Sequence, residues 1–109
     1  MTKRILKFKV KKQRLTRDRN CDFSNIVAGS VGYLRARFNL SSEWDDCVKV
    51  ASFWAEENGK EHAVYLDENN SCDIPVEALP NGYFFVQVTG AKAGYKIKTN
   101  KIGVKQEVH

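Results

Sequence analysis

The chain has 109 residues and a mass of 12.4 kDa, a length at which one hydrophobic core forms but two cores and a linker do not. Hydrophobic residues make up 42% and charged residues 28%, a composition that excludes an intrinsically disordered chain. No stretch approaches the roughly 18 consecutive apolar residues of a membrane-spanning helix. We therefore expect a single domain over residues 1–109 and no membrane partner.

The net charge of +5 is distributed unevenly along the chain. Residues 1–20 hold nine Lys and Arg against one Asp, or +8, whereas the remaining 89 residues hold nine against twelve acids, or −3. A basic end on an acidic body is typical of chains that bind a polyanion or an acidic neighbour in an assembly. Charge reports that a chain associates with something but does not show that it reads a nucleotide sequence. Nucleic acid is therefore the less favoured partner.

The cysteines and the N-terminus favour synthesis in a reducing cytoplasm. Cys21, Cys47 and Cys72 show no CxxC spacing, and their odd number leaves at least one unpaired. Residues 1–12 alternate charge with hydrophobes, unlike the apolar core of a secretion signal. Whether any two thiols pair stays open, because sequence spacing does not fix their separation.

The first predicted element is a basic strand within residues 3–15. Apolar residues alternate with lysines at period two, which indicates one buried and one solvated face. The apolar positions are Leu6, Phe8 and Val10, and the lysines are Lys7, Lys9 and Lys11. Two interpretations follow: the favoured one is an edge strand whose lysines discourage pairing with other sheets, and the other is an anion-binding stripe.

After an irregular connection over residues 22–32, a half-buried strand is predicted for residues 33–40, followed by a polar turn around Trp44. The next strand, residues 47–55, has no purely polar face. One face carries Cys47, Ala51 and Phe53, and the other carries Val48, Val50, Ser52 and Trp54. Both faces of the strand are therefore expected to be covered. The face with Val48, Val50 and Trp54 would be covered either by a second sheet of the same domain or by a neighbouring subunit.

The turn at residues 57–60 predicts a hairpin to a strand at residues 62–66. A turn at 67–71, a short strand at 72–74, one helical turn within 75–79 and a strand at 83–88 follow. Gly90 and Gly94 are expected to bracket the next turn, before strand segments at 95–97 and 102–104. About seven short strands predict an all-β fold, an immunoglobulin-like β-sandwich, with a five-stranded oligonucleotide-binding barrel as its rival.

No residue pattern predicts catalysis, a cofactor or a metal. His62 lies in a predicted hairpin strand and His109 is the last residue, a poor start for a triad or a zinc site. The acidic groups Glu43, Asp45 and Asp46 lack calcium-loop spacing, and no phosphate-binding glycine motif is present. Six aromatics could stack nucleic-acid bases, although the basic residues are not interleaved with them: Tyr33, Trp54, Tyr65, Tyr83, Phe85 and Tyr95.

Three stretches carry a family resemblance: Phe38 to Asp46 (FNLSSEWDD), Val50 to Phe53 (VASF) and Leu66 to Pro75 (LDENNSCDIP). With Gly90 and the pair Thr99 and Asn100, they resemble the small β-sandwich proteins and N-terminal modules of bacteriophage tails and baseplates. The resemblance covers residues 31–104. Two departures are Asp46, where glycine is common in that family, and the end of the chain at His109, without the extension that would carry a receptor-binding or fibre region.

The resemblance implies a structural virion protein of the tail, baseplate or capsid surface, without cofactor or turnover, made in the host bacterial cytoplasm. Its expected partners are other virion proteins or copies of itself. Alternative functions are a small phage-encoded inhibitor of a host defence protein or, less favoured, a single-stranded nucleic-acid-binding barrel. The candidate interface residues are Trp44, Trp54, Val48, Val50, Lys7, Lys9 and Lys11.

Overall fold

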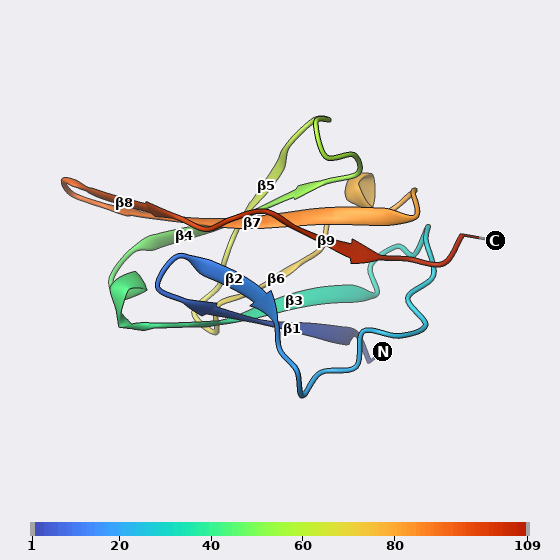
Figure 1. Ribbon diagram of the computed structural model, residues 1–109, viewed down its shortest axis with the longest axis horizontal. Helices are drawn as coiled ribbons and strands as arrows, with labels where there is room; N and C mark the ends of the chain where they lie inside the picture. The colour runs from blue at the N-terminus through green and yellow to red at the C-terminus, as the bar shows by residue number, and fades with distance from the viewer. Residues whose placement is uncertain (1, 109) are drawn as a thin grey trace.

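The computed structural model describes residues 2–108, which form two β-sheets with the hydrophobic core between them (Figure 1). These residues form more strands than the expected seven: β1 (Arg4–Lys11), β2 (Arg14–Arg17), β3 (Leu34–Leu40), β4 (Val48–Trp54), β5 (His62–Tyr65), β6 (Ser71–Asp73), β7 (Tyr83–Lys92), β8 (Tyr95–Lys98) and β9 (Ile102–Lys105). Helical structure among them is limited to two 3-10 turns, η1 (Ser42–Trp44) and η2 (Val76–Ala78). The all-β prediction is confirmed.

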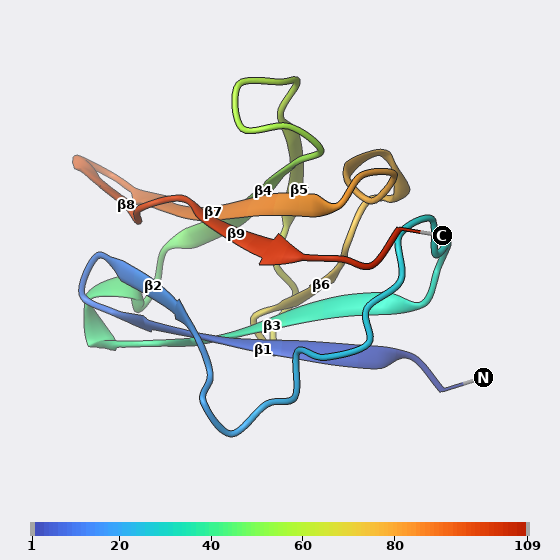
Figure 2. The same ribbon diagram turned by 45° about the vertical axis from the view of Figure 1, so that its right-hand side comes forward.

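The first sheet has the strand order β2-β1-β3-β6 and the second the order β5-β4-β7-β8. Strand β9 also pairs with β7, beyond β8 along the same strand (Figure 2). Adjacent strands are antiparallel except for β1 and β3, which pair in parallel over seven residues. The two sheets stay separate, so the rival five-stranded barrel is not formed.

The alternating pattern of the strands accounts for the core. Leu6, Phe8 and Val10 of β1 face inward and are almost fully buried, as predicted, while the lysines between them are exposed. The rings of Phe8 and Phe38 stack with centroids 5.2 Å apart across the parallel pair. The second sheet contributes inward side chains that complete the core: Ala51, Phe53, Phe84, Val86, Val88, Ile97 and Val104.

The basic segment at residues 3–15 is a hairpin and not a single strand. Lys12 takes a positive φ of 58° and reverses the chain, so that β2 returns along β1. A left-handed lysine gives no glycine or asparagine signal, and β2 has one buried residue, Leu15. Strand β1 therefore lies between β2 and β3, and the prediction that its lysines occupy a sheet edge is wrong.

The connection from β2 to β3 is irregular, as expected, and Arg4 organises it. The Arg4 guanidinium donates hydrogen bonds to the carbonyl oxygens of Asp22 (2.9 Å), Ser24 (2.7 Å) and Asn25 (3.3 Å). These bonds satisfy backbone groups that no strand pairs. The single β-bridge in this segment joins Val27 to Glu107, near the C-terminal end of the chain.

The later turns follow the predicted positions with one exception. Strands β4 and β5 form the predicted hairpin, and η2 is the predicted helical turn. Gly90, however, lies inside β7, which extends to Lys92, and the reversal occurs at Gly94 with φ of 68°. Gly90 is a strand residue without a side chain because the Trp44 ring packs against the β7 backbone at this position.

Candidate interaction surfaces

The side chains that could hold a metal ion are dispersed in the part of the chain that the structure describes. Among residues 2–108, no three His, Cys, Asp or Glu side chains are grouped as metal ligands. The thiols of Cys21, Cys47 and Cys72 are all free, which settles the question of pairing, and burial raises the pKa of Cys72 to about 12. His62 is half-buried on β5, and His109 lies outside the described residues.

Trp44 is a core residue, so its prediction as an interface anchor is wrong. Its side chain is 0% exposed, and its indole Nε1 donates a 2.7 Å hydrogen bond to the Lys12 carbonyl. A Cβ atom at Gly90 would lie 2.8 Å from Cε3 of this ring, which is why glycine occupies that strand position. A tryptophan in a short 3-10 turn has no periodic neighbours, and the sequence therefore could not show which way it points.

Trp54 lies on the outer face of the second sheet but is only 7% exposed. The Lys101 ammonium lies 3.8 Å from its ring centroid and also donates to the Glu57 carbonyl, 2.9 Å away. This arrangement is a cation–π contact, held by a loop carbonyl. Trp54 is thus covered from within the chain and is not available as the exposed interface anchor that was predicted.

Val48 and Val50 share this outer face, which no sheet of the domain covers. Val48 is 60% exposed, Val50 is half-buried, and Tyr65, the cross-strand partner of Val50, is 73% exposed. The opposite face of β4 supplies Ala51 and Phe53 to the core. The interpretation that the domain's own second sheet covers the apolar face is therefore wrong, and coverage by a neighbouring molecule stays a prediction.

Aromatic rings and lysines are closer on the second sheet than the sequence indicated. The rings of Tyr83 and Phe85 stack with centroids 6.4 Å apart, and Tyr83 is paired across strands with Lys105. Gly103 lies beneath Phe85, where a Cβ atom would be 3.0 Å from the ring. With Lys101 over Trp54, basic groups do lie beside these aromatics, contrary to expectation.

The outer face of the first sheet carries an unneutralised row of basic side chains, which we call the basic row: Lys7, Lys9, Lys11, Arg14 and Arg37. The lysines are all exposed on β1. Strand register places Arg37 of β3 beside Lys7, and Arg14 of β2 opposite Lys11. Among residues 2–108 no carboxylate lies within 4.0 Å of a charged nitrogen of the row. Arg14 and Arg37 were missed because register is not visible in the sequence.

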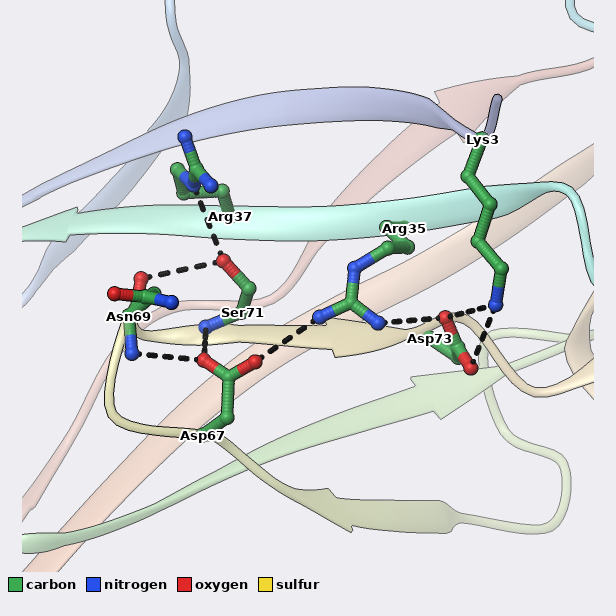
Figure 3. A network of polar contacts seen from close by, with 7 residues as sticks. All are labelled: Lys3, Arg35, Arg37, Asp67, Asn69, Ser71 and Asp73. Carbon is green, nitrogen blue, oxygen red and sulfur yellow. Dashed lines mark hydrogen bonds and ion pairs between the residues drawn. The ribbon is translucent and has the colours of Figure 1, made fainter. Parts of the chain in front are cut away.

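Among residues 2–108, the ion pairs of this face lie at its β6 edge, where Figure 3 shows them. Arg35 donates to Asp73 at 2.8 Å and to Asp67 at 3.1 Å, and Lys3 pairs with Asp73 at 3.1 Å. These contacts lower the pKa of both carboxyls: the first cause is the Lys3 hydrogen bond for Asp73 and the Ser71 backbone amide for Asp67. The first sheet thus divides into an ion-paired edge and the free basic row.

Within residues 2–108 neither helical turn has the length or apolar character that crossing a bilayer requires. In comparisons with known proteins, no family model, no curated protein and no solved structure matches this chain.

Proposed function

We propose that this chain is a non-enzymatic structural protein of a bacteriophage virion, a component of the tail, baseplate or capsid surface that acts through protein–protein contacts. It is made in the host bacterial cytoplasm and resides in the particle. The phage setting rests on the sequence pattern between residues 31 and 104. The contact function rests on the surface of the first sheet.

The observation that carries the contact function is the basic row in the middle of a sheet. Like charges directly across from one another in a sheet are destabilising, and Lys7 beside Arg37 and Lys11 opposite Arg14 are two such pairs. Edge protection does not explain them, because β1 has a neighbour on each side. A fold that keeps this unfavourable arrangement is best explained by an acidic partner that neutralises it.

We further propose an immunoglobulin-like classification. Strands β3 and β6 are neighbours in one sheet and β4, β7 and β8 in the other, the arrangement of strands B-E and C-F-G in that architecture. The parallel β1 and β3 pair and the added β2 are departures from it. At position 46, where the resembling sequences favour glycine, the backbone has φ of 63°, a conformation that suits glycine.

Quantitative mass spectrometry of purified particles from the encoding phage tests the virion function. A structural component is expected in several copies per particle, in fixed ratio to known tail or capsid proteins. Absence from the particles, together with a tight one-to-one complex with a host protein in infected cells, would replace the proposal by the host-directed inhibitor.

Single-stranded nucleic-acid binding is a second candidate, favoured by Lys101 and Lys105 beside Trp54 and Tyr83. Titration of the purified protein with a labelled oligonucleotide at several salt concentrations distinguishes it. This function predicts binding that weakens steeply with salt, in proportion to the phosphates neutralised. The structural function predicts no binding at physiological salt.

A further inference from the structure

Charge is separated across the molecule between two opposite sides. The basic side consists of the hairpin residues 11–17 and the segment 92–105, which together carry nine Lys and Arg and no Asp or Glu. The acidic side is the segment 55–79, with seven acids against Lys60, or −6. Two of these acids, Asp67 and Asp73, are ion-paired with Arg35 and Lys3 of the first sheet, and the other five form none of the described ion pairs. The two sides touch where Lys101 donates a hydrogen bond to the Glu57 carbonyl.

Hydrogen bonds between the sheets hold each side together. On the basic side, Gln13 Nε2 donates to the Lys98 carbonyl at 3.1 Å, and the Leu15 amide donates to Asn100 Oδ1 at 2.8 Å. Figure 2 shows the β1–β2 hairpin and β8 together at one end of the molecule. On the acidic side, the chain itself connects the sheets through the turn from β5 to β6, and the Asp67 amide closes that turn by donating to the Ser71 carbonyl at 2.9 Å.

The two sides are also opposite edges of the sheets. Strands β2 and β8 end their sheets on the basic side, and β6 and β5 end them on the acidic side. Strand β5 carries none of the lysines, prolines or bulges that usually protect an edge from pairing. Because strand directions alternate from β5 to β8, a translated copy would bring its β5 antiparallel to β8 of the first molecule.

Each side contains a hollow of complementary character. On the acidic side, a hollow of about 330 Å³ is lined by Val48 and Tyr65, by Lys49, and by the carboxylates of Asp67 and Glu68. Because Asp67 is paired with Arg35, Glu68 is the carboxylate of this hollow that can accept a further cation. Such a site suits a lysine, whose methylene stem packs on apolar surface while its ammonium meets an acid. On the basic side, a hollow of about 490 Å³ is lined by Lys11, Lys12, Gln13, Arg14 and Asn100.

We propose that copies of this chain associate head to tail, the basic side of one copy against the acidic side of the next, with Lys96 and Lys98 of β8 facing the hollow beside Glu68. The contact is heterologous, so it builds a ring or a filament and not a two-fold dimer. The inference rests on the proposed structural role, for which it names a second copy as one partner. It uses the sheet edges, including Lys11 and Arg14 at the hairpin, and leaves Lys7, Lys9 and Arg37 of the basic row free for other proteins.

A charge-swap experiment tests the interface. Two variants each reverse one side: K96E/K98E on the basic side and E57K/E68K on the acidic side. Sedimentation velocity over a concentration series is run on wild type, on each variant and on their equimolar mixture, at low salt and at about 1 M salt, where the screening length is about 3 Å. Circular dichroism checks the folding of each variant, and the neutral pairs K96Q/K98Q and E57Q/E68Q replace any variant that does not fold.

At low salt we expect the average mass of the wild-type particles to rise above the 12.4 kDa of the monomer as concentration increases. At high salt the protein should return to the monomer. Either reversal is expected to weaken association by at least about tenfold, because like charges then face each other. The mixture should restore it, since each reversed side meets its complement. The control K7E/K9E makes the same charge change on the basic row and should associate as wild type does.

A wild type that stays monomeric, association that neither variant weakens, or a mixture that fails to recover would each overturn the head-to-tail contact. These outcomes are separable from the proposed function. Failure of the charge swap with the protein still present in virions removes the self-contact alone, whereas recovery in the mixture with no protein in virions removes the structural role alone.

Discussion

A Cβ atom added at Gly90 would lie 2.8 Å from Cε3 and 3.0 Å from Cζ3 of Trp44, so this edge of the indole packs directly against the β7 backbone. Trp44 is fully buried, and its Nε1 donates to the Lys12 carbonyl. The ring therefore links η1, the β1–β2 turn and the second sheet. The connection is possible because Gly90 of β7 has no side chain.

Gly90→Ala is expected to destabilise the protein by about 1–3 kcal/mol, because the ring or the strand must move to admit the methyl group. Urea unfolding followed by tryptophan fluorescence measures the change. Gly82→Ala is the matched control, since its Cβ would meet nothing closer than 3.7 Å, and it should change stability little. Equal effects of both substitutions would contradict the packing of Trp44 on Gly90.

Lys101→Met keeps the aliphatic stem over Trp54 and removes the ammonium. We expect a loss of about 0.5–2 kcal/mol, the range of cation–π contacts from exposed to desolvated sites. Because Trp44 is fully buried in both proteins, any gain in acrylamide quenching should come from Trp54. Lys105→Met, which removes a lysine of β9 that makes no contact with Trp54, is the control. Unchanged quenching and stability in Lys101→Met would refute the contact.

Stability is expected to fall in acid through the carboxyls of the β6 edge. The pKa of Asp67 and of Asp73 is lowered in the folded state from 3.8, so their contribution is present above that pH and is lost as pH falls through the folded value. Asp73→Asn should cost less than about 1 kcal/mol near neutral pH, as exposed ion pairs do. The difference from wild type should vanish once the pH falls below the lowered folded-state pKa of Asp73, where both proteins carry a neutral side chain at this position.

Denaturant midpoints across this pH range measure the effect. Asp45→Asn removes a carboxylate that forms none of the described ion pairs and is the matched control. If the loss of stability in Asp73→Asn stays constant from neutral pH into acid, the ion pairs with Lys3 and Arg35 are not its cause.

The thiols should differ in reactivity according to burial. Cys21 is half-buried, whereas Cys47 and Cys72 are buried and burial raises the pKa of Cys72 to about 12. Ellman titration of the native protein is expected to detect one fast thiol, and titration in denaturant all three. Cys21→Ser should abolish the fast phase. Three fast thiols in the native protein would mean that the sheets open readily.

The sequence was sufficient to locate a strand wherever one face of that strand is apolar and the other is polar. Alternation located β1 and β3, the aromatic and β-branched residues located the 83–88 part of β7, and the turn around Gly59 predicted the β4–β5 hairpin. It failed at β2, where a lysine makes the turn and Leu15 alone marks the buried face. Periodicity also carries no information on which strands become neighbours, and so β1 was expected at an edge.

The candidate surfaces were predicted less well for the same reason. Exposure of Lys7, Lys9 and Lys11 follows from period two, and the structure confirms it. The positions of Arg14 and Arg37 beside them depend on register, which long-range pairing decides. Trp44 and Trp54 were mistaken for anchors because their coverings, Gly90 and Lys101, lie more than 40 residues away in sequence.

The most direct test of the central claim is particle incorporation of a charge-reversed basic row, K7E/K9E. A phage lacking the gene is complemented with wild type, with this variant, or with R19E/K60E, which makes the same charge change outside the basic row and outside the basic side of the head-to-tail contact. Copies of the protein per purified particle are counted by mass spectrometry. We predict that the basic-row variant is lost from particles while the control is retained; incorporation of both at wild-type levels would contradict the claim that this face is the contact surface.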